Sequence, residues 1–366
     1  MTTGLGALAL TGRERDLLVA ATAGADVAAA AWQRWRAGGS IEQSGLSEQQ
    51  LLPAVFANVP PEALAPSDEA ILRGLFRRSW YLHHRLAAVA HSSAAALRAA
   101  GIESLLLKGV ALAWSRYPAV AARPVSDLDV LVSVRTFERA VDVLLGEGWR
   151  LSIERDAPPW LQAVALVDDN GQELDLHRWV FAHRFGGADD GLWERSIPVE
   201  VAGSSMRRLT DEDQLVLTLL HGLLGGERNR LRWFLDVHHL VAGAPSWDAV
   251  LARARPARIA VRIEAGLRAT RQLLGTPVPD AVLEQLSAVP VPRGTRLVWA
   301  LERRARPAPV DLSLRAYLGY EVYRSAIRAA GRRPSVLGYI RMRYRDLRRQ
   351  RRLPWAARQA PAVARR

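Results

Sequence analysis

The spacing of apolar residues divides the chain into a helical beginning, a mixed middle and a helical end. Between residues 10 and 100, alanine-rich and apolar stretches recur at three- and four-residue spacing, which predicts helices. Gly101 follows where a left-handed glycine commonly ends a helix. The helical pattern resumes at Thr210 or Asp211, either of which can cap a helix ahead of the apolar stretch QLVLTLLHGLL.

The middle segment, from about 102 to 209, alternates strands with helices. IESLLLK and DLDVLVS predict short buried strands, and Gly109 opens a helix after the first of them. VRTFERAVDVLLGEG predicts an amphipathic helix. Two apolar runs then flank the dipeptide Asn170-Gly171, which favours a tight turn, so this region predicts a β-hairpin.

Together these patterns predict a mainly helical α+β protein with a small mixed β-sheet. We expect an N-terminal helical region at 1–100, an α/β core at 101–209, a C-terminal helical domain at 210–330 and an arginine-rich tail at 331–366. A chain of 366 residues is long enough for two or three such domains.

The net charge of +13 is concentrated in the tail. Residues 331–366 contain twelve arginines and one acid, Asp346, so the tail carries +11 and the rest of the chain +2. Because Tyr339, Tyr344 and Trp355 lie among these arginines, the tail is suited to bind RNA or an anionic membrane surface. The alternative is a solvated basic end without a partner.

The absence of cysteine excludes disulfides and cysteine-based metal or nucleophile chemistry, and it fits a reducing compartment. No run of about 18 apolar residues is free of charge, so we expect no transmembrane helix. The N-terminus has no basic region ahead of its short apolar stretch, unlike a signal peptide. These features favour a cytoplasmic protein.

Two aspartates in the run SDLDVLV are the strongest chemical signal. Side chains alternate along a strand, so Asp127 and Asp129 face one side while Leu128 faces the core. Adjacent carboxylates on a buried strand repel each other unless a cation lies between them. A hard divalent ion such as Mg²⁺ meets that need. The alternative is a strand end with two solvated aspartates.

The predicted hairpin supplies further ligands. Its second strand presents Glu173, Asp175 and His177 on one face. A third carboxylate from a neighbouring strand would complete a two-metal site for in-line displacement at phosphorus. One ion would activate the attacking hydroxyl, and the other would bind the triphosphate.

Lys108 is the single lysine among 50 lysines and arginines. It precedes Gly109 at a predicted strand-to-helix turn, where free N–H groups and the helix dipole favour a phosphate. Glycine there would allow close backbone approach, and a compact ammonium acts as a point charge that a guanidinium cannot replace. Coding bias is the alternative explanation. The P-loop and GxGxxG patterns are absent.

The order LLLKG, ARPVSDLDVLV, ELDLHRW and LRWFLDVHHL resembles the uncharacterised bacterial nucleotidyltransferase family, within the DNA-polymerase-beta-like superfamily. The similarity extends from about residue 45 to 255. Its most specific parts are Arg123 with the run from Ser126 to Asp129, and the run from Leu174 to His177.

The resemblance implies a reaction and roles for these residues. Asp127, Asp129 and Asp175 would bind two Mg²⁺ ions, and Asp175 would also be the general base. The enzyme would transfer a nucleoside monophosphate from an NTP to a hydroxyl on a small molecule, such as an antibiotic or a natural-product intermediate, or on a tRNA or protein. Lys108 and Gly109 would replace the glycine-serine turn of the superfamily, where this chain has no serine.

The remaining candidates keep two interpretations each. Arg123 and Ser126 could contact the nucleotide, although Arg123 could equally pair with an aspartate and position it. His177 could orient the acceptor or the ligands, or be a satisfied strand histidine. Arg232 and Asp236 lie four residues apart on a predicted helix. The resemblance implies that this helix closes the cleft, but a structural ion pair is the simpler interpretation.

A rival hypothesis from a different class is a non-catalytic protein that keeps the fold and binds a nucleotide or a partner. The complete set of carboxylates argues against it, whereas the missing turn serine argues mildly for it.

Overall fold

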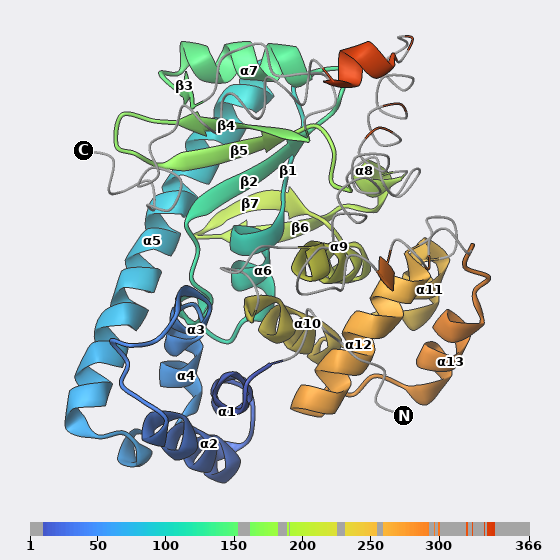
Figure 1. The fold of residues 1–366 in the computed structure, drawn as a ribbon. Coiled ribbons are helices and arrows are strands. Elements are labelled where there is room, and N and C mark those ends of the chain that lie inside the picture. The colour runs from blue at the N-terminus through green and yellow to red at the C-terminus, as the bar shows by residue number, and fades with distance from the viewer. Residues whose placement is uncertain are drawn as a thin grey trace.

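Figure 1 shows the fold in a computed structural model of the chain. The structure describes residues 10–152, 162–181, 189, 191–224, 231–254, 259–292, 296, 299–300, 320, 324, 333 and 335–340. Within these residues, helices surround one seven-stranded sheet that has both parallel and antiparallel neighbours. The expected mainly helical α+β class is therefore confirmed.

Five α-helices precede the first strand, as the spacing predicts. Thr11 caps the first: its hydroxyl accepts from the N–H of Glu14, whose carboxylate accepts from the N–H of Thr11. The fifth has 34 residues, so it is about 50 Å long, and it ends before Gly101, which has a φ of +67°. These helices are α1 (Gly12–Ala20), α2 (Ala25–Ala37), α3 (Leu46–Gln49), α4 (Leu52–Asn58) and α5 (Pro66–Ala99).

The seven strands lie in the order β3-β4-β5-β2-β1-β7-β6. Strand β2 lies near the middle, antiparallel to β1 and parallel to β5. The strands are β1 (Ser104–Leu106), β2 (Asp127–Val132), β3 (Arg150–Leu151), β4 (Ala163–Val167), β5 (Glu173–His177), β6 (Ile197–Val201) and β7 (Ser204–Arg208).

Two hairpins form part of the sheet. The expected one joins β4 to β5, and Gly171 in its turn has a φ of +71°. The other joins β6 to β7, where no tight-turn dipeptide predicts a hairpin. Its turn places both Ala202 and Gly203 at positive φ, as the favoured two-residue hairpin turn requires, but alanine gives no sequence signal for that conformation.

Helices α6 to α13 follow β1 within the described residues, and residues 336–340 are helical as well. Thr210 rather than Asp211 caps the ninth helix, because its hydroxyl accepts from the N–H of Asp213 at 3.3 Å. The helices are α6 (Lys108–Arg116), α7 (Phe137–Gly146), α8 (Leu192–Arg195), α9 (Asp211–Leu224), α10 (Arg232–Ala242), α11 (Trp247–Ala254), α12 (Ala260–Leu274) and α13 (Asp280–Ala288). Among the described helices, none combines the length and the apolar character needed to cross a membrane.

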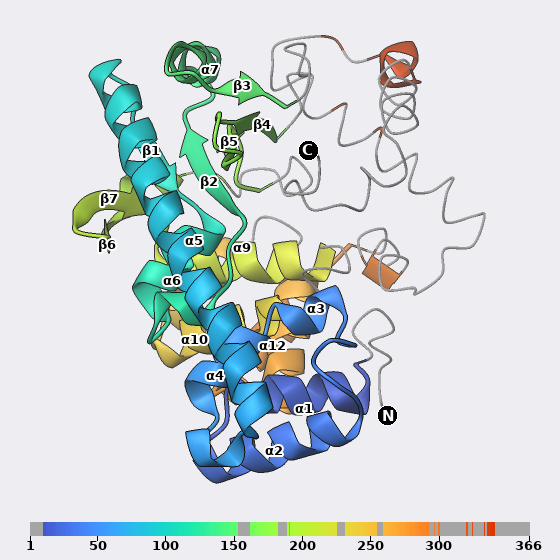
Figure 2. The same ribbon diagram turned by 90° about the vertical axis from the view of Figure 1, so that its left-hand side faces the viewer.

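The two faces of the sheet meet different cores. On one face, Leu128, Val130 and Val132 of β2 belong to a core shared with α5 and α7. Figure 2 shows α5 running from the sheet layer down to the N-terminal helices. The second core joins the N-terminal helices to α9–α13, and Leu131 on the opposite face of β2 contributes to it. The division at residues 100, 209 and 330 stays a prediction.

Candidate active site

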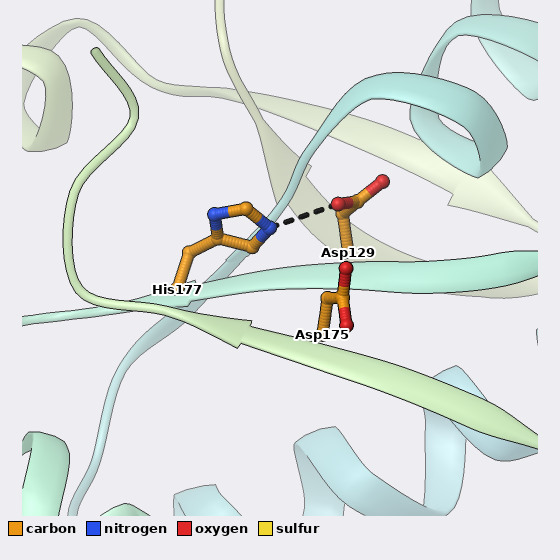
Figure 3. Close-up of side chains that lie close together, drawn as sticks. All are labelled: Asp129, Asp175 and His177. Atoms are coloured by element: carbon orange, nitrogen blue, oxygen red, sulfur yellow. Dashed lines mark hydrogen bonds and ion pairs between the residues drawn. The ribbon is translucent and has the colours of Figure 1, made fainter. Parts of the chain in front are cut away.

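The carboxylates of two neighbouring strands converge at the middle of the sheet. The parallel register pairs Asp127 with Glu173 and Asp129 with Asp175. Asp129 and Asp175 project to the same side, together with His177 (Figure 3). One ligand atom from each of these three side chains lies within 4.8 Å of the other two. The structure therefore brings together carboxylates that lie 46 residues apart in the sequence.

Lys108 reaches this cluster from the first position of α6. The N–H of Leu107 donates to the backbone oxygen of Asp129 at 3.0 Å, which holds the turn beside β2. The Nζ of Lys108 then donates to Oδ1 of Asp129 at 2.6 Å and lies 3.5 Å from Nε2 of His177. That Nε2 lies 2.8 Å from the same Oδ1. Lys108 and His177 thus both contact one carboxylate oxygen.

The backbone of Lys108 is strained. Its φ is +46°, a left-handed conformation that a residue with a Cβ adopts at a cost of about 1–2 kcal/mol. Strain of this kind is concentrated at functional sites, where the surrounding structure compensates for it. Leu107 has no side-chain group that can cap α6, so the first N–H groups of the helix remain suited to an anion.

The three carboxyl groups differ in the direction in which the protein shifts their pKa values. Burial disfavours the charge of Asp129, but Lys108 and His177 outweigh it and lower the pKa of Asp129. Burial and the charges of Asp129 and Asp127 raise the pKa of Asp175 to about 6. Burial, followed by the charge of Asp129, also raises the pKa of Asp127. Negative charge at this site therefore exceeds what the neighbouring cations neutralise.

The same imbalance acts on Lys108. Burial alone would lower its pKa, but the charges of Asp129, Asp127 and Asp175 together raise it. Lys108 is therefore a permanent cation. One ammonium faces three carboxylates whose oxygens are the ligands that hard divalent cations prefer. The residues present thus fit a magnesium site.

Asp127 is the first residue of β2, and Ser126 directly precedes it. Ser126 is exposed, and its hydroxyl donates to Oδ1 of Asp127 at 3.2 Å. Asp127 is partly buried, and Lys108 and Arg232 both act to lower its pKa against the effect of burial. Asp127 lies outside the compact group formed by Asp129, Asp175 and His177.

His177 is buried at the end of β5. Besides the contact with Asp129, its second ring nitrogen, Nδ1, is buried and has no hydrogen-bond partner among the described residues. The ring therefore orients the carboxylate of Asp129 from the side of β5. Of the two interpretations that the sequence leaves open, this contact supports the one that concerns the ligands.

Arg123 lies inside the protein. Its Nε and Nη2 donate to the two oxygens of Asp236 at 2.7 and 2.8 Å, and the hydroxyl of Tyr117 donates to the same carboxylate at 2.6 Å. The Arg123 side chain is only 5% exposed. The contact supports the interpretation that Arg123 pairs with an aspartate, although the aspartate belongs to α10 and not to the run at the start of β2.

The same arginine explains the glycine after Lys108. A Cβ on Gly109 would lie 2.9 Å from Nη1 of Arg123 and 3.1 Å from Val125. Glycine is thus required by the packing of Arg123 against the start of α6. The sequence suggests instead that it makes room for a phosphate.

Asp236 and Arg232 lie on the same helix, but the partner of Asp236 is Arg123. Arg232 donates from Nη1 to the side chain of Gln50 at 2.9 Å and to the backbone oxygen of Pro124 at 3.1 Å. Its charge still helps Arg123 to lower the pKa of Asp236. Arg232 therefore ties α10 to the segment that leads into β2.

Sequence reasoning misses His221 on α9. His221 is exposed at its surface. Desolvation by the surrounding protein, followed by the charge of Lys108, nevertheless lowers the pKa of His221 to about 4. The charges of Asp129 and His177 also act on this ring, so α9 borders the site. The sequence signal is weak: one histidine, followed by a glycine, within the mostly apolar run LVLTLLHGLL.

Comparison with known proteins assigns the family. The model of a family described as uncharacterised nucleotidyltransferase matches residues 46–275, well over half of the chain. The chain belongs to this family. Lys108 and all three aspartates lie inside the matched region, and the resemblance drawn from the sequence is confirmed at this level. The protein is accordingly an enzyme of the nucleotidyltransferase class.

Other comparisons give only distant similarity. No curated protein matches the chain. One similar solved structure is the solution structure of the antibiotic-resistance factor ANT(2'')-Ia, with 14% identity, a TM-score of 0.35, and coverage of 52% of this chain and 92% of that one. Another is an antigenic nucleotidyltransferase-like protein from Paracoccidioides brasiliensis, with 13% identity, a TM-score of 0.38, and coverage of 56% and 92%.

Proposed function

We propose that this nucleotidyltransferase uses Mg²⁺ to transfer a nucleoside monophosphate from an NTP to a hydroxyl acceptor, with release of pyrophosphate. The observation that carries the proposal is the pairing of Asp129 with Asp175 on parallel strands, beside Asp127 and opposite Lys108. Family membership supports the reaction class.

Asp127, Asp129 and Asp175 would hold the metal, with His177 orienting Asp129. When bound, two Mg²⁺ ions would supply activation of the acceptor hydroxyl and charge neutralisation of the triphosphate. This assignment follows from the donor set, because carboxylate oxygens suit Mg²⁺ and their mutual repulsion is relieved by added positive charge.

Asp175 is our candidate for the general base. In the metal-free protein, burial and the charges of Asp129 and Asp127 raise the pKa of Asp175 to about 6. Bound Mg²⁺ would favour the ionised form, so Asp175 would be a carboxylate that can accept the hydroxyl proton at neutral pH. In the reaction, a bond forms between the acceptor oxygen and the α-phosphorus, the bond to pyrophosphate breaks, and the hydroxyl proton passes to Asp175.

Lys108 and the first turn of α6 would bind the phosphates. No serine follows Gly109, because Val110 occupies that position. The ammonium of Lys108 would take over as the phosphate donor, and the exposed hydroxyl of Ser126, beside Asp127, would be a second donor. Gly109 would contribute a backbone N–H. We assign Arg123 a positioning role, because its donors hold α10 and pack against Gly109.

The acceptor remains one of three chemical classes: a small hydroxylated molecule, a tRNA end or a protein hydroxyl. We also propose a cytoplasmic enzyme, since NTP is available there and the chain has no cysteine. Affinity for RNA or an anionic surface would reside in the tail at 331–366.

The test is to incubate the enzyme with Mg²⁺ and each labelled NTP, and to measure pyrophosphate in the presence of each acceptor class. We expect release that requires both the metal and an acceptor and that EDTA abolishes. The Asp127→Asn/Asp129→Asn double variant should lose Mg²⁺-dependent NTP binding in calorimetry. Tight NTP binding without pyrophosphate release under any condition would favour the non-catalytic alternative.

A further inference from the structure

Helix α5 carries a strongly basic stretch along the outside of the described protein, at the left of Figure 1. Residues 70–99 contain five arginines and no acidic residue. The 330 residues ahead of the tail carry a net charge of only +2. The positive charge of the body is therefore concentrated on this one helix.

Two exposed aromatic residues lie among these arginines. Trp80 is 51% exposed and Tyr81 is 54% exposed, and no other tryptophan, tyrosine or phenylalanine that the structure describes is as exposed. Arg77 lies three and four residues before the two rings. Arg78 lies three residues before Tyr81, and Arg85 lies four residues after it. Residues at these intervals are neighbours on one side of a helix.

The opposite side of the same helix is buried. Its buried residues recur at intervals of three, four and seven: Leu72, Ser79, His83, Leu86 and Ala90. The helix is thus amphipathic, and the two rings and the arginines around them lie on its solvent side.

The ring of Trp80 is held in one orientation although half of the residue is exposed. The ring of His84, one turn later, lies 4.0 Å from it, and Nδ1 of His84 lies 2.9 Å from the backbone oxygen of Trp80. His84 also contacts the ring of Trp114 on α6, at 5.5 Å. The guanidinium of Arg85 lies 5.7 Å from the centre of the Tyr81 ring. Rings that are already ordered lose little conformational freedom when they bind a partner.

Arg77 and Arg78 are available to bind an anion. Both residues are exposed, and neither side chain forms an ion pair or a hydrogen bond with any residue that the structure describes. Arg73, one turn earlier, differs in this respect because it is paired with Glu69. Two uncompensated guanidinium groups therefore lie directly beside the two exposed rings.

The basic aromatic face of α5 consists of three arginines and two aromatic residues: Arg77, Arg78, Trp80, Tyr81 and Arg85. We propose that this face binds single-stranded RNA. The rings would stack on unpaired bases, and the arginines would contact the neighbouring phosphates. The arginine-rich tail would add charge, while the contacts with bases would lie on α5. The proposal is independent of the reaction proposed above.

The two rings favour single-stranded RNA over a duplex or a membrane. Bases in a duplex already stack on one another, so a duplex would use the arginines and leave the rings unused. A helix that binds a membrane surface commonly inserts aliphatic side chains. Apart from the two rings, the exposed residues between 70 and 88 are arginine, alanine and glycine. This face therefore offers base-stacking surface and charge but no aliphatic side chain for insertion.

The experiment is fluorescence anisotropy of a labelled single-stranded RNA of about 12 nucleotides, titrated with the full-length protein at several salt concentrations. Trp80→Ala/Tyr81→Ala should weaken binding at least about tenfold, because each stacked base is lost, and should leave the salt dependence unchanged. Arg77→Gln/Arg78→Gln should weaken binding and reduce the slope of log affinity against log salt by about 1.4. Circular dichroism checks that each variant folds.

A matched control is Arg268→Gln/Arg271→Gln, which removes the same charge from α12 and should bind RNA nearly as wild type does. Ultraviolet cross-linking of the wild-type complex locates the contact without altering the tail. Mass spectrometry of tryptic peptides should find RNA attached to residues 79–85, which trypsin releases as one peptide because Arg78 precedes it and Arg85 ends it.

Four outcomes would overturn the proposal. The first is an RNA affinity that is unchanged in the Trp80→Ala/Tyr81→Ala variant. The second is a set of cross-links confined to the tail. The third is an equal loss of affinity for duplex RNA in the same variant, because paired bases cannot stack on the rings. The fourth is binding to anionic vesicles that requires Trp80 and Tyr81 in a protein that does not bind RNA, which would assign the face to a membrane.

Discussion

The Nζ of Lys108 donates a hydrogen bond to Oδ1 of Asp129 over 2.6 Å. The chain's single lysine therefore contacts the central carboxylate of the candidate site, at a backbone position where φ is +46°. This contact explains why a compact ammonium stands where the chain otherwise uses arginine. A planar guanidinium needs more width and prefers two parallel hydrogen bonds, whereas Oδ1 of Asp129 is already shared with His177.

We expect Lys108→Arg to lose turnover nearly as severely as Lys108→Ala. Each loss should correspond to about 2–4 kcal/mol of transition-state stabilisation, the range for removal of one preorganised electrostatic group. The measurement is kcat/KM for pyrophosphate release, with circular dichroism to confirm folding. Wild-type activity in the arginine variant would mean that the lysine is an accident of coding.

A glycine variant separates the charge of Lys108 from its backbone strain. Glycine adopts positive φ without steric cost, so Lys108→Gly should be at least as stable as Lys108→Ala. Both should be equally inactive. Recovery of activity in the glycine variant alone would show that the backbone conformation, and not the ammonium, matters for turnover.

Asp175→Asn should remove turnover, whereas Glu173→Gln should cost little. Both side chains lie on one face of β5, but Asp175 pairs in register with Asp129 and belongs to the compact ligand group, which Glu173 does not. Steady-state kinetics of the two variants tests this assignment. The reverse order of activities would move the third carboxylate two residues toward the hairpin turn.

The raised pKa of Asp175 predicts a pH-dependent stability. Burial, then the charges of Asp129 and Asp127, raises this pKa from 3.8 to about 6, so the folded state binds the proton more tightly than the unfolded state. Its contribution to the free energy of unfolding is therefore fully present below pH about 4 and is lost as the pH rises through about 6.

Asparagine cannot ionise, so Asp175→Asn should be more stable than wild type at pH 8, by about 1–3 kcal/mol. That difference should shrink toward pH 4. Urea unfolding in EDTA at several pH values measures it. A constant difference across this range would contradict the raised pKa, and added Mg²⁺ should stabilise wild type more than the variant.

The buried pair between Arg123 and Asp236 should be costly to break from either side. Asp236→Ala leaves a buried guanidinium without its carboxylate, and we expect a loss of about 3–5 kcal/mol in the free energy of unfolding. Asp280→Ala, which removes the partner of Arg271 at an exposed site, serves as control and should change stability little. Similar small effects at both positions would exclude a positioning role for Arg123.

The sequence alone determined the features that depend on near neighbours. The two-residue period of a strand places Asp127 and Asp129 on one face, and Asn170-Gly171 forms the turn that makes β5 antiparallel to β4. The cap at Thr210 and the end of α5 at Gly101 follow from equally local chemistry. Each of these depends on backbone conformations and hydrogen bonds within a few residues, so one stretch of sequence is enough to predict them.

Tertiary structure decided which distant residues meet. The register that sets Asp129 beside Asp175 depends on how β2 and β5 bury their leucines in a shared core, which no local spacing specifies. Asp236 could pair with its helix neighbour Arg232 by spacing alone, yet it binds Arg123, 113 residues earlier. A buried carboxylate is stabilised only by a donor with good hydrogen-bond geometry. Helix packing determines which arginine meets that requirement, so the sequence spacing alone does not identify the partner.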